Sequence, residues 1–148
     1  MWPRIAKIAL LQTDEPQGDA YRQAFDSIAF NNYVHAPMER AAVPPSAEHI
    51  KVAQEVYLNE LAELKPHLSL VLAKRVYLNL PNQGTKGTDV EFDGKVRSMW
   101  VYDLGGHRTL VGWLKHPASG HWVHGWRDEI EVGFARKYVE IARGELSR

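Results

Sequence analysis

The chain has 148 residues, a length usual for one compact domain. Its 18 Lys and Arg residues equal its 18 Asp and Glu residues, which excludes the large positive charge of a non-specific nucleic-acid binder. The sequence contains no cysteine, which excludes disulfides, thiolate catalysis and cysteine-bound metal. No apolar stretch approaches the roughly 20 residues that span a bilayer. We therefore expect a single domain, residues 1–148, in the cytoplasm and without a membrane partner.

Helices and two strands are predicted for the first half of the chain. Apolar residues at helical spacing predict a helix over 3–12 and a second over 19–25. The run 27–34 is apolar and aromatic, which favours a buried strand. An amphipathic helix over 46–65 and a short apolar strand over 68–72 follow. The two strands and the helix between them predict a right-handed βαβ unit.

The second half begins with a short predicted helix over 74–80. Residues 81–94 are polar and contain glycine, which is typical of a loop without core residues. Two β-like runs, 96–102 and 109–114, flank a Gly-Gly turn and predict a hairpin. Apolar residues at helical spacing over 126–146 predict an amphipathic helix that closes the domain.

Two polar segments follow predicted strands, Asn31-Asn32 and the stretch His116–Gly120. Ligands of open α/β sheets bind at that end of the strands. An asparagine amide carries an acceptor and a donor, and can read the edge of uracil or a similar base. A histidine can donate to a developing oxyanion, with backbone donors of the adjoining turn beside it. The alternative is that these residues only form turns.

Three histidines, His116, His121 and His124, lie within nine residues. Three imidazoles can bind zinc and leave a fourth position open. Their spacing fits no familiar helical ligand pattern, and tryptophans are interleaved with them. We favour an aromatic loop that packs on the last helix or contacts nucleic acid, and expect neither metal nor cofactor.

Five segments resemble the uracil-DNA glycosylase superfamily in residue type and in order. They are Phe30–His35, Pro44–Glu48, Leu61–Pro66, Leu70–Lys74 and His116–Ser119. The resemblance covers about residues 26–126 and implies a three-layer α/β/α fold with a short, mostly parallel sheet. It also implies a hydrolase of DNA repair that cleaves the N-glycosidic bond of uracil without a cofactor. In that family Asn32, or its neighbour Asn31, would contact uracil, and His116 in the segment ending at Ser119 would stabilise the uracil anion.

The chain also departs from this family. Its members begin with a strand and a Gly-rich loop whose polar residue positions water, and no such segment precedes Asn32 at the required distance. Asp14 is the nearest candidate, but lies too close in sequence. We therefore expect recognition of DNA, a free base or a nucleotide, with weak or no hydrolysis. The alternative is a non-catalytic binding or interaction module, pairing as a homodimer through an exposed sheet edge.

Overall fold

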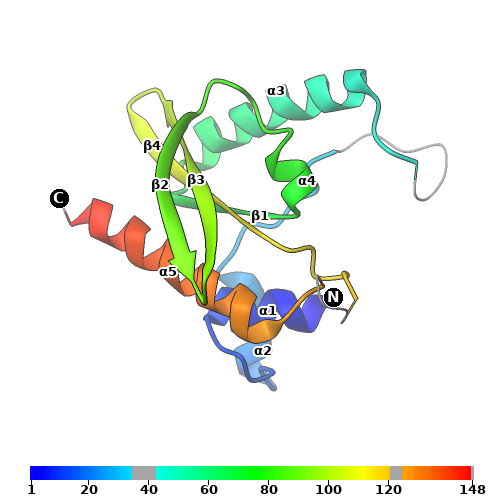
Figure 1. The fold of residues 1–148 in the computed structure, drawn as a ribbon, viewed down its shortest axis with the longest axis vertical. Helices are drawn as coiled ribbons and strands as arrows, with labels where there is room; N and C mark the ends of the chain where they lie inside the picture. The colour runs from blue at the N-terminus through cyan, green and yellow to red at the C-terminus, as the bar shows by residue number, and fades with distance from the viewer. Residues whose placement is uncertain (35–42, 121–124, 148) are drawn as a thin grey trace.

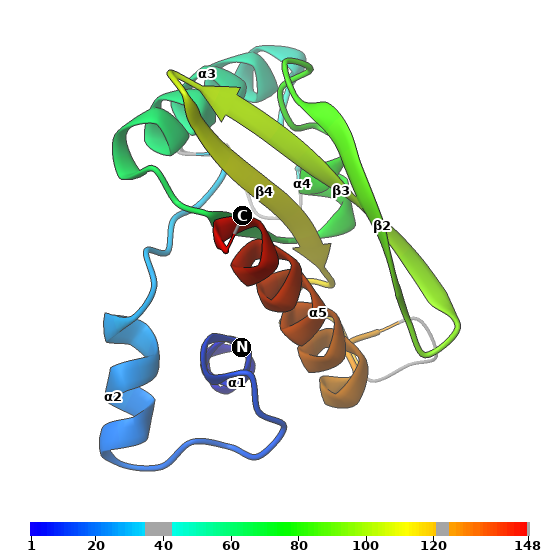
Figure 2. The same ribbon diagram turned by 90° about the vertical axis from the view of Figure 1, so that its left-hand side faces the viewer.

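The computed structural model describes residues 1–34, 43–120 and 125–147. This part of the chain forms helices and a four-stranded sheet, a mixed α/β architecture (Figures 1 and 2). In chain order the elements are α1 (Trp2–Leu10), α2 (Asp19–Asp26), α3 (Ala47–Leu64), β1 (Leu68–Leu72), α4 (Lys74–Tyr77), β2 (Thr85–Phe92), β3 (Lys95–Leu104), β4 (His107–Leu114) and α5 (Asp128–Leu146). The predicted helices and the predicted strands after residue 67 are therefore confirmed, with small shifts at their ends.

The sheet has the strand order β1-β4-β3-β2. Only β1 and β4 are parallel, whereas β2 pairs with β3 and β3 with β4 in antiparallel fashion. The prediction of a mostly parallel sheet is therefore wrong. Two tight turns cause the difference, because Gly94, Gly105 and Gly106 adopt positive φ values that return the chain directly beside the preceding strand.

The segment 27–34 is not a strand, and the predicted βαβ unit does not form. Phe30 is 45% exposed, and the Tyr33 ring packs on Tyr57 of α3, while its hydroxyl donates to the Asn79 carbonyl at 2.8 Å. Aromatic residues here attach a connecting segment to helices instead of filling a sheet. The parallel partner of β1 is β4, which comes after it in the chain.

Residues 81–94 contain strand β2, so the prediction of a loop without core residues is also wrong. Val90 of this strand is buried, with 3% of its surface exposed. β2 is one of the two edge strands of the sheet, and most of its side chains are polar and face solvent. Such an edge strand lacks the apolar alternation that marks a half-buried strand.

Helices cover both faces of the sheet. On one face, Phe134 and Tyr138 of α5 join Ile8 of α1 in a core with strand residues. On the other, Leu61 of α3 and Tyr77 of α4 pack against the sheet. Figure 2 shows α5 running across the near face with α1 beside it and α3 on the far side. This places the start of α5 next to α1 and the segment after β4.

Candidate functional site

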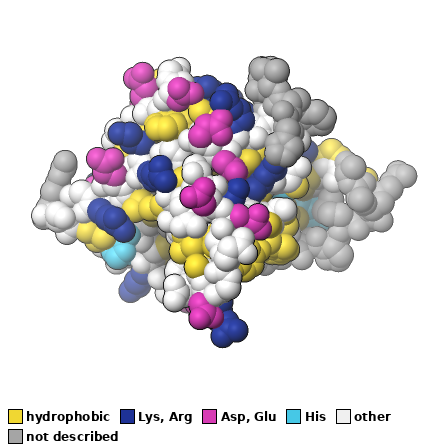
Figure 3. All heavy atoms as spheres, turned by 90° about the horizontal axis from the view of Figure 1, so that it is seen from below, with side chains coloured by type: hydrophobic (Ala, Val, Ile, Leu, Met, Phe, Trp, Pro, Cys, Tyr) yellow, Lys and Arg dark blue, Asp and Glu magenta, His cyan; other side chains and the backbone are white. Residues whose placement is uncertain are grey.

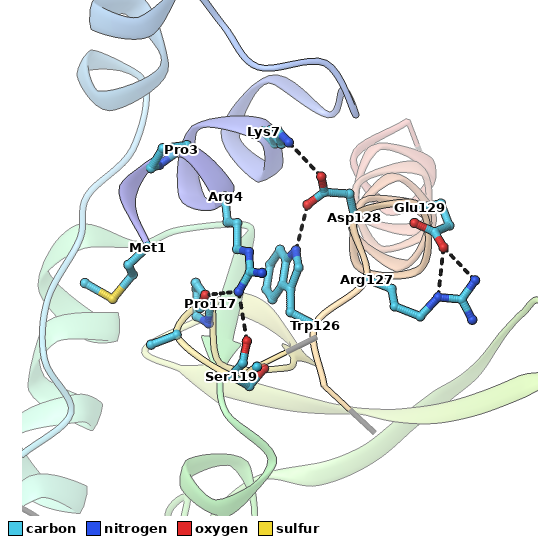
Figure 4. A pocket seen from close by; sticks show the side chains of 12 residues that line it. Met1, Pro3, Arg4, Lys7, Pro117, Ser119, Trp126, Arg127, Asp128 and Glu129 are labelled. Carbon is cyan, nitrogen blue, oxygen red and sulfur yellow. Dashed lines mark hydrogen bonds and ion pairs between the residues drawn. The ribbon is translucent and has the colours of Figure 1, made fainter. Parts of the chain in front are cut away.

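An open pocket of about 930 Å³ lies between α1, the segment after β4 and the start of α5 (Figure 4). Leu114 at the end of β4 pairs with Leu72 at the end of β1. The segment that begins at Lys115 therefore leaves the carboxyl end of the one parallel strand pair among the described residues, a usual place for a ligand in an α/β sheet. The residues Pro117–Gly120 form one wall of the pocket, and the His116 side chain is not among the lining residues.

The residues His116–Ser119 form a turn closed by three hydrogen bonds. The Ala118 backbone N–H donates to His116 Nδ1 at 3.0 Å. The Ser119 backbone N–H and Oγ both donate to the His116 carbonyl, at 2.9 and 2.7 Å. Because Nδ1 accepts a hydrogen bond, the neutral ring carries its proton on Nε2. The His116 side chain is exposed, so this Nε2–H is an available donor.

Arg4 of α1 is hydrogen-bonded to two backbone carbonyls of this turn. Its Nη1 donates to the carbonyls of Pro117 and Ser119, at 2.5 and 2.9 Å. The guanidinium also lies over the ring of Trp126, 5.6 Å from its centroid. One side chain of the first helix thus joins two segments that are more than a hundred residues away in the sequence.

Lys7, Asp128 and Trp126 form a second link between α1 and α5. Lys7 Nζ donates to Asp128 Oδ2 at 2.6 Å, and the indole Nε1 of Trp126 donates to Asp128 Oδ1 at 2.8 Å. Burial raises the pKa of the Asp128 carboxyl, but the hydrogen bonds from Lys7 and Trp126 outweigh this effect and leave that pKa below its usual value. Asp128 is therefore a carboxylate whose two oxygens are both engaged.

The chain on either side of the turn is anchored as well. The Lys115 backbone N–H donates to Glu131 Oε2 at 2.9 Å, and Lys115 Nζ donates to the Gly125 carbonyl at 3.0 Å. The Trp126 backbone N–H donates to the Gly120 carbonyl at 3.2 Å. His116 thus belongs to a segment whose two ends are held together.

Neither of the two predicted asparagines lines the pocket, and Asn31 is hydrogen-bonded to α3. The Asn31 amide donates to Glu60 of α3, and its Oδ1 accepts from the Asn32 backbone N–H at 2.9 Å. The Asn32 side chain is exposed. We expected Asn32 and His116 just past the ends of adjacent strands, but this basis is wrong because 27–34 is not a strand. Within the described residues, no hydrogen bond or ring contact joins Asn32 to His116.

The other candidates divide between the described and undescribed parts of the chain. Asp14 is exposed on the segment after α1, where its backbone carbonyl accepts from Gln12 Nε2 at 3.1 Å. His121 and His124 lie outside the described residues. Over 1–34, 43–120 and 125–147, no three His, Cys, Asp or Glu residues are grouped so as to hold a metal ion. None of the helices over these ranges has the length and apolar character needed to cross a membrane.

Sequence reasoning missed the contributions of Arg4, Lys7 and Asp128. Basic residues on an amphipathic first helix are ordinary, and no local pattern links them to a loop near residue 117. Only the packing of α1 beside α5 brings these residues to the His116 turn.

The fold and site define a mixed α/β protein with a pocket, lined by both charged and apolar residues, at the carboxyl end of its parallel strand pair. No protein family model, curated protein or solved structure matches the chain.

Proposed function

We propose that this protein is a uracil-DNA glycosylase-like domain that recognises uracil, or a related base or nucleotide, beside His116. The observation that carries the proposal is the hydrogen bond from the Ala118 N–H to His116 Nδ1. It leaves an exposed Nε2–H donor, the group that a carbonyl oxygen of a base requires. The same donor would stabilise an oxyanion if the glycosidic bond were broken.

The charge of the pocket fits a small ligand of low charge. Three basic side chains line it, Arg4, Lys7 and Arg127, and two acidic ones, Asp128 and Glu129, so the excess is one positive charge. Arg127 is hydrogen-bonded to Glu129, and Lys7 to Asp128. Figure 3 shows acidic and basic side chains interspersed on the face that it displays. Recognition would rest on directed hydrogen bonds more than on attraction of a polyanion.

Hydrolysis would be weak or absent. A glycosylase needs a polar group that holds water against the sugar, and the pocket carboxylate of Asp128 is already engaged by Lys7 and Trp126. Asp14 is exposed on a separate segment.

In this proposal Asn32 supplies the base-reading amide from a segment outside the pocket lining. If the protein is active, it is a DNA N-glycosylase that needs no cofactor.

The second candidate is an interaction module that pairs with a second copy through β1. The His67 carbonyl accepts from the Leu110 N–H, so the odd-numbered residues of β1 bond β4. Leu68, Leu70 and Leu72 then direct their N–H and C=O groups to the other edge of the strand. No strand within the described residues pairs with that edge, and open strand edges favour association.

The test combines a cleavage assay with a binding assay. Uracil-containing single- and double-stranded DNA would be incubated with the protein and then treated with alkali to break abasic sites. Uracil and uridine monophosphate would be titrated into ¹⁵N-labelled protein and followed by NMR. His116→Gln and Asn32→Ala are the test variants. His67→Gln is the matched control, because His67 is an exposed histidine outside the 115–120 segment.

We expect shifts at residues 115–120 on addition of a base or nucleotide, lost in His116→Gln and kept in His67→Gln. Loss of binding in Asn32→Ala would support its role as the base reader. Cleavage that disappears in both test variants would add glycosylase activity to base recognition. Absence of both cleavage and binding in the unaltered protein would overturn the proposal and favour the interaction module.

A further inference from the structure

The peptide group between Pro117 and Ala118 is hydrogen-bonded at both of its ends. Its carbonyl accepts from Arg4 Nη1 at 2.5 Å, and its N–H donates to His116 Nδ1 at 3.0 Å. The peptide is trans, and a planar trans peptide points its C=O and N–H in opposite directions. Fixing the direction of the Pro117 carbonyl therefore fixes the direction of the Ala118 N–H.

We propose that Arg4 is a positioning residue that acts through this one peptide to hold His116 in its Nε2–H form. A cation on the carbonyl polarises the peptide and strengthens the donor at its other end, since linked hydrogen bonds reinforce one another. The strengthened Ala118 N–H keeps Nδ1 an acceptor. Arg4 thus sets the tautomer of the His116 ring through the 117–118 peptide.

The second bond of Arg4 makes this arrangement specific. The same Nη1 donates to the Ser119 carbonyl at 2.9 Å, so Arg4 joins two carbonyls of the turn. Figure 4 shows the Arg4 guanidinium directed at the Pro117 and Ser119 segment, with Trp126 beside it. Rotating the 117–118 peptide away from His116 would break the bond from Arg4 to Pro117.

Lys7 provides a matched comparison on the same helix. It too joins α1 to the start of α5, through Asp128 at 2.6 Å, but it makes no hydrogen bond to the turn within the described residues. Loss of Lys7 would weaken the attachment of α1 as a whole. Loss of Arg4 would in addition release the 117–118 peptide. The two variants therefore separate general docking of α1 from control of the His116 ring.

The inference rests on the proposed function only in assigning a ligand contact to His116, and its test uses no ligand. The imidazole nitrogens of ¹⁵N-labelled protein would be recorded at mildly alkaline pH, where an ordinary imidazole is neutral. The scalar coupling across the hydrogen bond between Ala118 N and His116 Nδ1 would be measured as well. His116→Gln assigns the His116 signals. Arg4→Met, Arg4→Lys and Lys7→Met are compared, with circular dichroism to confirm that each is folded.

The unaltered protein should show an unprotonated Nδ1, a protonated Nε2 and the coupling to Ala118. Arg4→Met should lose the coupling and give averaged nitrogen shifts, and Arg4→Lys, which keeps a cationic donor, should restore both. Lys7→Met should lower the melting temperature but leave the His116 signals in place. Unchanged His116 signals in Arg4→Met, equal changes in Lys7→Met, or no coupling in the unaltered protein would each overturn the inference. If Arg4→Met does not fold, the test rests on Arg4→Lys. A folded Arg4→Lys variant that lacks the coupling between Ala118 N and His116 Nδ1 would then overturn the inference.

Discussion

Arg97 and Glu131 form a buried, two-pronged ion pair with N···O distances of 2.8 and 2.9 Å. Their side chains are 4% and 0% exposed. The Arg97 guanidinium lies between the rings of Trp113 and Phe134, 4.2 and 3.9 Å from their centroids. Glu131 also accepts the Lys115 N–H. The pair therefore ties β3 and α5 to the segment that leads into the His116 turn.

Removing one partner of this pair should be costly. Glu131→Leu leaves a buried guanidinium without its counter-ion, and Arg97→Met leaves a buried carboxylate without its own, so we expect each to lose about 3–5 kcal/mol in the free energy of unfolding. The double variant Arg97→Met with Glu131→Leu removes both charges and should recover a large part of that loss. Urea unfolding of the single and double variants measures both effects.

A surface ion pair serves as the control for that series. Lys86 and Asp89 are 3.4 Å apart and both exposed, so Lys86→Ala should change the free energy of unfolding by less than about 1 kcal/mol. A double variant as unstable as the sum of its single variants would show that Arg97 and Glu131 contribute independently of each other, contrary to this prediction.

Two glycines of α5 should respond oppositely to alanine. A Cβ on Gly133 would lie 2.1 Å from the ring of Phe92. A Cβ on Gly144 would have no atom of the described residues within 4 Å, apart from its chain neighbours and the backbone of its own helix. Gly133→Ala should destabilise the protein by about 1–3 kcal/mol because the Phe92 ring must move. Gly144→Ala should stabilise it by up to about 1 kcal/mol through helix propensity. Thermal unfolding compares the two, and a Gly133→Ala variant as stable as Gly144→Ala would disprove the close contact.

The carboxylate of Asp128 should make the free energy of unfolding depend on pH in the acidic range. Its pKa in the folded protein lies below the ordinary value of 3.8, so the carboxylate contributes stability that is fully present above that pH. This contribution is lost as the pH falls through the folded pKa. Asp128→Asn removes the contribution, and its deficit against the unaltered protein in urea unfolding should be constant above pH 3.8 and shrink below it. A deficit that does not change with pH would contradict this account.

Association through β1 remains a prediction that light scattering can check. An interaction through the free edge should raise the mean mass with protein concentration. Leu70→Pro removes an N–H that points to that edge and not to β4, so it should reduce association while the bonds to β4 persist. A mass that stays monomeric at every concentration would argue against a dimer through this edge.

Local signals were sufficient for most elements. Pro3 within a first helical turn predicted α1. Ser46, which accepts a hydrogen bond from the His49 N–H at 3.2 Å, marked the start of α3. The run 68–72 was short, apolar and directly preceded by a helix, which predicted β1. In each case the determining interactions lie within a few neighbouring residues and can be read from their order.

Pairing between distant segments was decided only by the tertiary structure. Residues 27–34 and 85–92 were assigned wrongly. The composition of a segment does not show whether another strand will pair with it, or whether it will lie at the edge of the sheet. The order of the sheet and the ion pair between Arg97 and Glu131 depend on such pairing.

The candidate site divides in the same way. The sequence by itself predicted a site at His116 and Ser119, since a polar turn after an apolar strand is a local pattern, and of these two residues Ser119 lines the pocket. It did not identify Arg4, whose hydrogen bonds to Pro117 and Ser119 span more than a hundred residues. Contacts of this kind exist only after α1 has packed beside α5. Many apolar contacts throughout the core contribute to the free energy that places α1, and no single sequence motif specifies them.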